Sequence, residues 1–217
     1  MSLVASTENI LNVYRNATVQ DIVDGTEWYA RARRLAMDLD PADPVKGAAA
    51  IALVSPMTPW DRNVWLAGEA YRLHAADLDV GTLLPTLKGN ARKVARVLNG
   101  ENPANVVGGL KVTAFWLTIA DPTNPSAVVI DRHAYDIAVG ETTNDEIRSR
   151  AIGTPKRYAA LAALYVEAAD ILSKESGQTI LPSTVQAITW TAWRRTMIRI
   201  SAAVRRAEGI TDHTAVN

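Results

Sequence analysis

Only one stretch of this 217-residue chain, Ala127–Ile130, has the short run of apolar and β-branched residues that is typical of an extended segment. Almost every other segment places apolar residues three and four positions apart, the spacing that puts them on one face of a helix. A parallel sheet would need several strand-like runs that alternate with helices. We therefore predict an all-α fold with about nine or ten helices and no substantial sheet.

The composition excludes several classes of site. The chain contains no cysteine, which excludes disulfides, thiolate zinc sites, iron–sulfur clusters and cysteine nucleophiles. Its histidines (His74, His133 and His213) form no ligand spacing, so we predict no metal site and no cofactor. The longest apolar run, Ala48–Val54, is far shorter than the ~20 residues that cross a bilayer. Because the N-terminus is charged and has no long apolar stretch, we expect a cytoplasmic protein without a membrane partner.

The charges balance overall but are unevenly placed. The chain has 23 basic and 23 acidic side chains, whereas a protein that binds nucleic acid over its whole surface would be strongly basic. An acid-free stretch from Ser176 to Ala207 carries Arg194, Arg195, Arg199, Arg205 and Arg206. A second basic cluster consists of Lys88, Arg92, Lys93 and Arg96, extended by Lys111. Each cluster is either a solvated helix face or a local patch that binds phosphates.

Two motifs stand twenty positions apart. Gly108 and Gly109 precede Lys111 at the start of a predicted helix, where small residues let a ligand approach and free N–H groups favour an anion. Further along, the apolar extended piece ends at Asp131, followed by His133, at the start of another predicted helix. The first motif is typical of phosphate contact, and the second brings a carboxylate to the end of a buried segment.

This pair resembles the helix-hairpin-helix DNA glycosylase superfamily, which has the endonuclease III-like fold. In that superfamily a glycine-rich hairpin ends in Gly-x-Lys, and an acid motif follows about twenty residues later. The chain is most similar to a bacteriophage branch, whose motifs match Ser55-Pro56, Trp60 to Asn63, Gly109 to Lys111, Asp131 to His133 and Gln186 to Trp190 before Arg194-Arg195. The resemblance covers about Trp28 to Arg206. The usual Leu-Pro-Gly-apolar-Gly hairpin is replaced here by Asn105-Val106-Val107-Gly108-Gly109.

The resemblance implies a site and its chemistry. Cleavage of an N-glycosidic bond develops positive charge on the sugar, and Asp131 would be the carboxylate that stabilises it. Lys111 would be the amine that attacks C1′ in lyase-type relatives. A base flipped out of the duplex needs a pocket, which Trp60, Asn63, Gln186 and Trp190 would line. The residues implied in nucleic-acid binding are Gly108, Gly109, His133, Arg92, Lys93, Arg194, Arg195 and Arg199.

The resemblance also implies one two-lobed domain over residues 1–217. One lobe would span about residues 44–139, with a hairpin-like segment at 103–119. The other lobe would combine residues 1–43 with 140–210, and residues 211–217 would form a disordered tail.

Each implied residue has a structural alternative. Asp131 stands where a helix N-cap is expected, and Asp is a favoured cap. Lys111 would otherwise be a surface lysine, and His133 a hydrogen-bonded, half-buried histidine. The tryptophans Trp60, Trp190 and Trp193 would pack in the core or between the lobes. Asn63 and Gln186 would bridge helices, since buried amides need partners.

Three functions remain open from the sequence. The first is a DNA glycosylase-like protein that acts on a nucleobase in DNA, in base excision or in phage DNA base modification, in the host cytoplasm. The second is a non-catalytic DNA-binding module on the same scaffold. The third is a phage helical protein that inhibits a host factor, which the zero net charge favours. In the first two, DNA binding would be local and salt-sensitive, and no pattern sets the oligomeric state.

Overall fold

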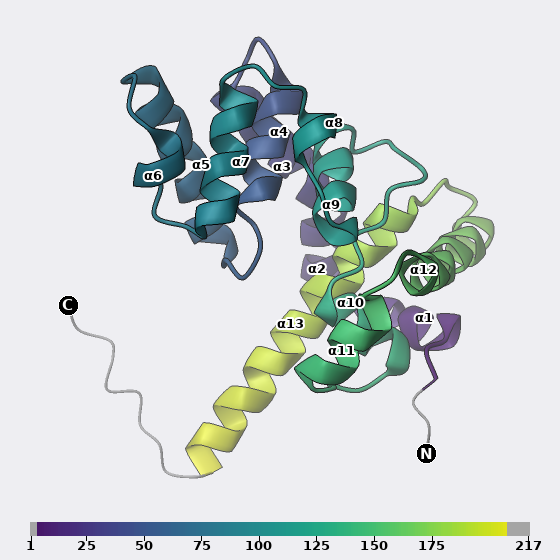
Figure 1. Ribbon diagram of the computed structural model, residues 1–217. Coiled ribbons are helices and arrows are strands. Elements are labelled where there is room, and N and C mark those ends of the chain that lie inside the picture. The colour runs from purple at the N-terminus through teal and green to yellow at the C-terminus, as the bar shows by residue number, and fades with distance from the viewer. Residues whose placement is uncertain (1–3, 208–217) are drawn as a thin grey trace.

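The chain folds into helices joined by short loops (Figure 1). The computed structural model describes the backbone of residues 4–207 and the side chains of residues 4–201. Within these residues there are thirteen helices and no strand, which confirms the all-α prediction. The tail predicted at 211–217 lies outside the described residues.

The helix count exceeds the predicted nine or ten because some helices are too short or too exposed to show apolar periodicity. The helix α6 (Val80–Leu83) is a single turn. The helix α11 (Asp145–Ile152) has no buried residue, so its sequence shows no apolar face. It begins instead at a polar cap, because Asn144 accepts the N–H of Ile147 at 2.9 Å.

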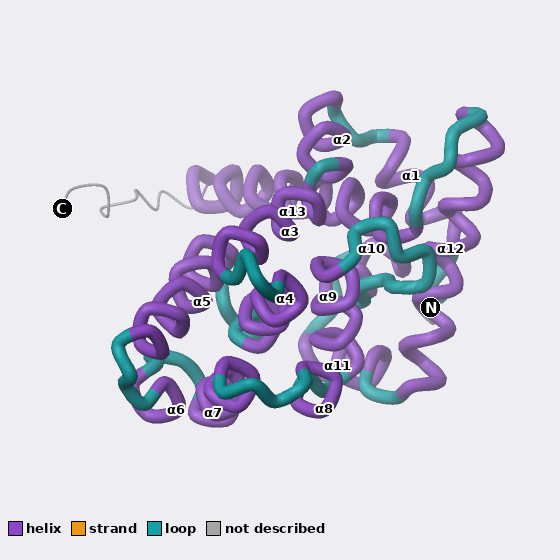
Figure 2. Tube along the Cα trace, turned by 90° about the horizontal axis from the view of Figure 1, so that it is seen from above, coloured by secondary structure: helices purple, strands orange, loops and turns teal. Residues whose placement is uncertain are grey.

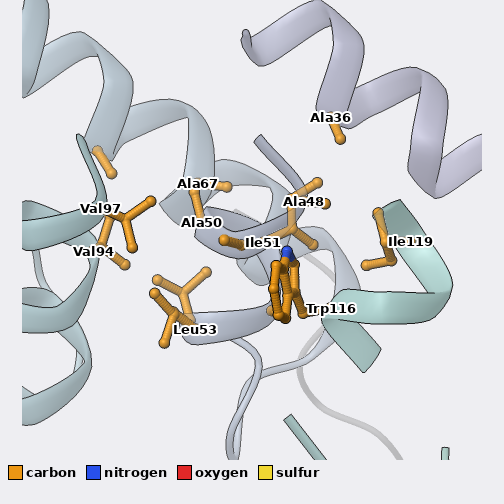
Figure 3. Close-up of a cluster of buried hydrophobic side chains, with 14 of the residues drawn as sticks. Ala36, Ala48, Ala50, Ile51, Leu53, Ala67, Val94, Val97, Trp116 and Ile119 are labelled. Atoms are coloured by element: carbon orange, nitrogen blue, oxygen red, sulfur yellow. The ribbon is translucent and has the colours of Figure 1, made fainter. Parts of the chain in front are cut away.

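A first hydrophobic cluster holds together the helices of one half of the molecule (Figure 3). These helices are α3 (Trp28–Leu39), α4 (Pro44–Leu53), α5 (Trp60–Ala75), α6, α7 (Lys88–Leu98), α8 (Pro103–Val106) and α9 (Leu110–Ala120). At its centre α4 is buried on all sides from Gly47 onward, as its alanine-rich sequence allows. A Cβ on Gly47 would lie 2.2 Å from the carbonyl oxygen of Ala36, so glycine lets α3 and α4 pack in close contact.

A second hydrophobic cluster lies in the other half of the molecule. It draws on α1 (Thr7–Arg15), α10 (Arg132–Val139), α12 (Pro155–Ser176) and α13 (Pro182–Ala207), with α11 at its edge. Its largest fully buried side chain is Tyr165 of α12, whose hydroxyl donates to the carbonyl oxygen of Ala134 at 2.9 Å. Figure 2 shows α4 to α9 gathered on one side and α1, α10 and α12 on the other.

The two clusters differ from the predicted lobes in two helices. The helix α3, predicted with residues 1–43, packs in the first cluster because the small side chains of Ala32 and Ala36 allow close packing on α4. The helix α10, predicted within 44–139, packs in the second cluster, where Ile137 and Ala138 are fully buried.

The extended segment Ala127–Ile130 passes between the two clusters. Successive side chains of an extended chain point to opposite sides. Val129 accordingly belongs to the first cluster, and Val128 and Ile130 belong to the second. The segment pairs with no strand. Instead, the hydroxyl of Tyr158 accepts the N–H of Ile130 and donates to the carbonyl oxygen of Val128, both at 2.9 Å.

The helix α13 also joins the two halves, since Val185 packs in the second cluster and Ala187 in the first. The helix α2 (Val19–Thr26) lies against it. A Cβ on Gly25 would lie 2.4 Å from the Cα of Ile188, so glycine is required for this contact. Among the helices of residues 4–207, none is long and apolar enough to span a membrane.

Candidate functional site

Asp131 lies where the extended segment meets α10, at the junction of the two clusters. Its Oδ1 accepts the N–H of Ala134 at 2.8 Å, so Asp131 is the N-cap of α10, as its structural alternative predicts. Its Oδ2 accepts the indole N–H of Trp190 at 3.2 Å. The second contact is not part of the cap, and it brings α13 to the same carboxylate.

Lys111 stands in the first turn of α9, on the side of the first cluster. Its Nζ donates to the hydroxyl of Ser55 at 3.1 Å and lies 5.0 Å from the centre of the Phe115 ring. Burial lowers the pKa of Lys111, and the negative charge of Asp131 acts in the opposite direction. Lys111 is therefore a half-buried amine near Asp131 and not a free surface lysine.

Aromatic rings from four helices surround this region. Trp28 is at their centre, because its ring centroid lies 4.8 Å from that of Trp60, 5.8 Å from that of Phe115 and 6.1 Å from that of Trp190. The predicted Trp60 and Trp190 are thus brought together, both half-buried. We call Trp28, Tyr29, Trp60, Phe115 and Trp190 the aromatic cluster.

Gln186 is attached to the same cluster. It is 4% exposed, and its Oε1 accepts the hydroxyl of Tyr29 at 2.8 Å. Burial and the negative charge of Asp131 both raise the pKa of Tyr29 well above its usual value. Gln186 therefore bridges α13 to α3, as its structural alternative predicts, beside the carboxylate.

Asn63 is 2% exposed and lies on α5 one turn after Trp60. Its side-chain carbonyl oxygen has no hydrogen-bond partner within the described residues. Leaving a buried acceptor unsatisfied costs about 1–3 kcal/mol, so such atoms in native proteins call for an explanation. An incoming donor, from a ligand or a water molecule, would satisfy it.

His133 stands in the first turn of α10, and its ring centroid lies 6.5 Å from that of Trp190. Burial lowers the pKa of His133, and Asp131 acts in the opposite direction. Its Nδ1 is buried without a hydrogen bond in the part of the chain that the structure describes. His133 is therefore half-buried, as its structural alternative predicts, but its Nδ1 does not make the hydrogen bond that this alternative expects.

The predicted phosphate contacts lie at the start of α9. Gly109 has a φ of +86°, a backbone conformation that glycine adopts without strain, and no side chain caps the helix after it. A Cβ on Gly108 would lie 3.9 Å from the Nζ of Lys93, so this ammonium group faces the glycines. Arg92, the next residue along α7, packs instead toward Gly81 of α6.

The arginines of α13 divide into different roles. Arg194 and Arg199 are exposed, and the guanidinium carbon of Arg194 lies 4.7 Å from the centre of the Trp190 ring. Arg195, predicted to bind nucleic acid, instead ties α13 to α2. Its Nη2 lies 2.5 Å from Oδ2 of Asp21, which is 3% exposed, and its Nη1 donates to Thr18 at 2.6 Å.

Except for Arg199, the residues described above fall within one family match. The chain belongs to a family of unknown function (DUF7178), which matches residues 1–197. No curated protein and no solved structure matches the chain.

The sequence analysis did not identify part of this candidate site. Trp28, Tyr29 and Phe115 received no role, and Ser55 was noted only as part of a motif. These side chains come together only because α3, α4 and α9 pack against one another. The one local pattern that could have indicated them is the pair of adjacent aromatic residues, Trp28 and Tyr29. A separate cavity of about 260 Å³ involves Tyr135, Ile147 and Arg157, and none of the predicted site residues lines it.

The arrangement has two chemical capacities. Half-buried tryptophan rings can stack on a planar ligand, because every aromatic base has a π-face. An amine with a lowered pKa can attack an electron-poor carbon, and a nearby carboxylate can stabilise positive charge on that carbon. Within residues 4–201 no group of three His, Asp or Glu side chains could hold a metal ion.

Proposed function

We propose that this protein is a DNA glycosylase-like enzyme that acts on a nucleobase in DNA. One observation carries the proposal. Lys111 of α9 and Asp131, the N-cap of α10, belong to different halves of the molecule, yet both contact the aromatic cluster, Lys111 through Phe115 and Asp131 through Trp190. The negative charge of Asp131 also opposes the lowering of the Lys111 pKa by burial. The resemblance to the helix-hairpin-helix superfamily assigns the same two residues to catalysis.

The proposed chemistry uses the two groups in turn. A base turned out of the duplex stacks on the aromatic cluster, which places C1′ of its sugar near Lys111. The bond between C1′ and the base breaks, the base leaves with the electron pair and takes up a proton, and Asp131 stabilises the positive charge on the sugar. The lone pair of Lys111 then forms a bond to C1′. The bond between C1′ and O4′ breaks, one proton passes from the nitrogen to O4′, and the open-chain sugar is left joined to Lys111 as a protonated imine.

Burial supports the role of Lys111. An amine can attack only in its unprotonated form, and burial lowers the pKa of Lys111 toward the range where that form is populated. The contact with Ser55 uses one N–H of the amine as donor and leaves its lone pair free. The contact therefore orients the amine without blocking it.

The amides of the site support recognition of a base. The side-chain oxygen of Asn63 has no donor among the described residues, and the side-chain oxygen of Gln186 accepts from Tyr29 of the aromatic cluster. An unsatisfied acceptor one turn from an aromatic ring is complementary to a donor on the hydrogen-bonding edge of a base. The bacteriophage resemblance supports a role in the cytoplasm of a bacterial host.

Borohydride trapping tests the proposal. Duplex oligonucleotides that carry uracil, alkylated, oxidised or phage-type modified bases are incubated with the wild type and with Lys111→Met, Asp131→Asn and Lys156→Met variants. Lys156 is exposed and serves as the control. We expect a covalent adduct with wild type and Lys156→Met, none with Lys111→Met, and slower base release with Asp131→Asn. An intact panel of substrates after incubation with wild type would contradict the proposal.

A second function, a non-catalytic DNA-binding module, is favoured by one specific observation. Both oxygens of Asp131 and the amine of Lys111 already have partners within the chain, as structural groups do. This function predicts that wild type and Asp131→Asn bind duplex DNA equally and that neither releases a base.

A further inference from the structure

The helix α13 is longer than the body against which it packs. Figures 1 and 2 both show its C-terminal part extending beyond the other helices. Among the described side chains of α13, Met197 is the last that makes a hydrogen bond outside the helix. Its sulfur accepts the hydroxyl of Thr142 at 3.4 Å. Beyond it, Ile198 and Ile200 are 59% and 51% exposed, and Arg199 is exposed. We call residues 198–207 the arm.

The arm carries positive charge without an acidic partner of its own. Between Glu175 and Glu208 the chain has no Asp or Glu. Arg195 is neutralised by Asp21, but Arg199 makes no ion pair among the described residues. The sequence places two further arginines, Arg205 and Arg206, in the last turns of the same helix.

The arm begins about two helical turns beyond Trp190 of the candidate site. Arg194, four residues before the first exposed isoleucine of the arm, stacks on the Trp190 ring, and the same ring donates its N–H to Asp131. A helix rises 1.5 Å per residue, so the ten residues of the arm extend about 15 Å. Phosphates of one DNA strand are spaced by about 3.4 Å, so the arm is long enough to run beside about four of them.

We propose that the arm lies along the sugar–phosphate backbone of the DNA that flanks the nucleotide held in the site. This inference deepens the proposed function, on which it rests. Three arginines on a short helix without acids are complementary to a polyanion. Two copies of the arm packed together would instead bring like charges into contact.

A charge-neutralising variant tests the arm. Arg199, Arg205 and Arg206 are replaced by Gln, which keeps a good helix propensity, and a second variant replaces them by Glu. The matched control replaces the exposed Arg34, Lys156 and Lys174 by Gln, with the same change in net charge. Circular dichroism and thermal unfolding establish that each variant folds.

Fluorescence anisotropy with a 30-base-pair duplex gives the readout. The slope of log K against log salt is negative, and each lost phosphate contact reduces its magnitude by about 0.9. We expect the arm variants to lose about 2–3 units of slope and at least tenfold in affinity, and the control to bind as wild type does.

The outcomes separate the arm from the proposed function. If no substrate loses a base but the arm variants still lose affinity for the duplex, the arm stands and the glycosylase proposal fails. Arm variants that bind DNA with the affinity and salt slope of the wild type would contradict the proposed contact of the arm with DNA. A wild-type protein that binds no DNA would contradict it too. If the arm variants lose binding to anionic lipid vesicles while their DNA affinity is unchanged, the arm contacts a membrane and the proposal fails. If they no longer form a dimer while their DNA affinity is unchanged, the arm contacts a second copy of the chain and the proposal also fails.

Discussion

The indole N–H of Trp190 donates to Oδ2 of Asp131 at 3.2 Å, which joins the last helix of the chain to the first turn of α10. The backbone N–H of Ala134 occupies the other carboxylate oxygen. Asp131 is thus held in one orientation by two donors with different origins, one from the helix that it caps and one from across the molecule. Substitutions that remove one donor, or one oxygen, separate the structural function of this carboxylate from a catalytic one.

Asp131→Asn and Asp131→Ala should have different effects. Asn is also a good N-cap, but its amide nitrogen cannot accept the Trp190 N–H, so the Asn variant should lose about 1–2 kcal/mol of unfolding free energy. Ala removes the cap as well and should cost ~0.5–2 kcal/mol more. If the carboxylate stabilises a sugar cation, the Asn variant should lose at least a hundredfold in base release. Urea unfolding and a release assay measure the two effects. An Asn variant that is fully active would leave Asp131 only its role as a cap.

Trp190→Phe keeps an aromatic ring but removes the donor to Asp131. Hydrogen bonds to charged groups contribute about 1.5–3 kcal/mol, so we expect a loss of about 1–2 kcal/mol for this half-buried bond. Trp193→Phe is the matched control, because the indole N–H of Trp193 has no hydrogen-bond partner among the described residues. Thermal unfolding of the two variants compares them. Equal losses would show that the contact with Asp131 contributes nothing to stability.

The pH dependence of stability should report the burial of Lys111. Its pKa is lowered on folding, so the unfolded chain binds more protons between the folded pKa and the ordinary value of about 10.5. The unfolding free energy of wild type should therefore rise relative to that of Lys111→Met as pH increases through this window. Urea unfolding at several pH values measures the difference. A constant difference would mean that folding leaves the pKa unchanged.

Adduct formation should depend on pH through the same group. The unprotonated fraction of Lys111 grows with pH, so the rate of adduct formation should rise and level off below the usual pKa of lysine. An adduct rate that stays flat up to pH 9 would argue against Lys111 as the nucleophile.

Arg194 and Arg195 are adjacent in sequence but should differ in their effect on stability. Arg195→Met leaves the buried carboxylate of Asp21 without its cation, which should cost about 3 kcal/mol. Arg194→Met removes only an exposed stacking contact, worth about 0.5–1 kcal/mol. Urea unfolding ranks the two variants. The opposite ranking would contradict the assignment of Arg195 to the contact between α2 and α13.

Local patterns predicted the helices and the residues that begin them. The start of α9 at the two glycines and the cap at Asp131 follow from residues within one turn, so they could be seen in the sequence. The pairing of Arg195 with Asp21 could not, because it depends on how α2 packs against α13. The same limit hid Trp28, whose ring meets three others only after α3, α5, α9 and α13 have packed.

The segment Ala127–Ile130 has a consequence for how this chain can vary. Its side chains alternate between the two hydrophobic clusters, so inserting or deleting one residue would exchange every apolar side chain between them. The same change would turn Asp131 away from Trp190. Relatives of this chain can therefore exchange Val and Ile freely in this segment, but its length should change only by an even number of residues.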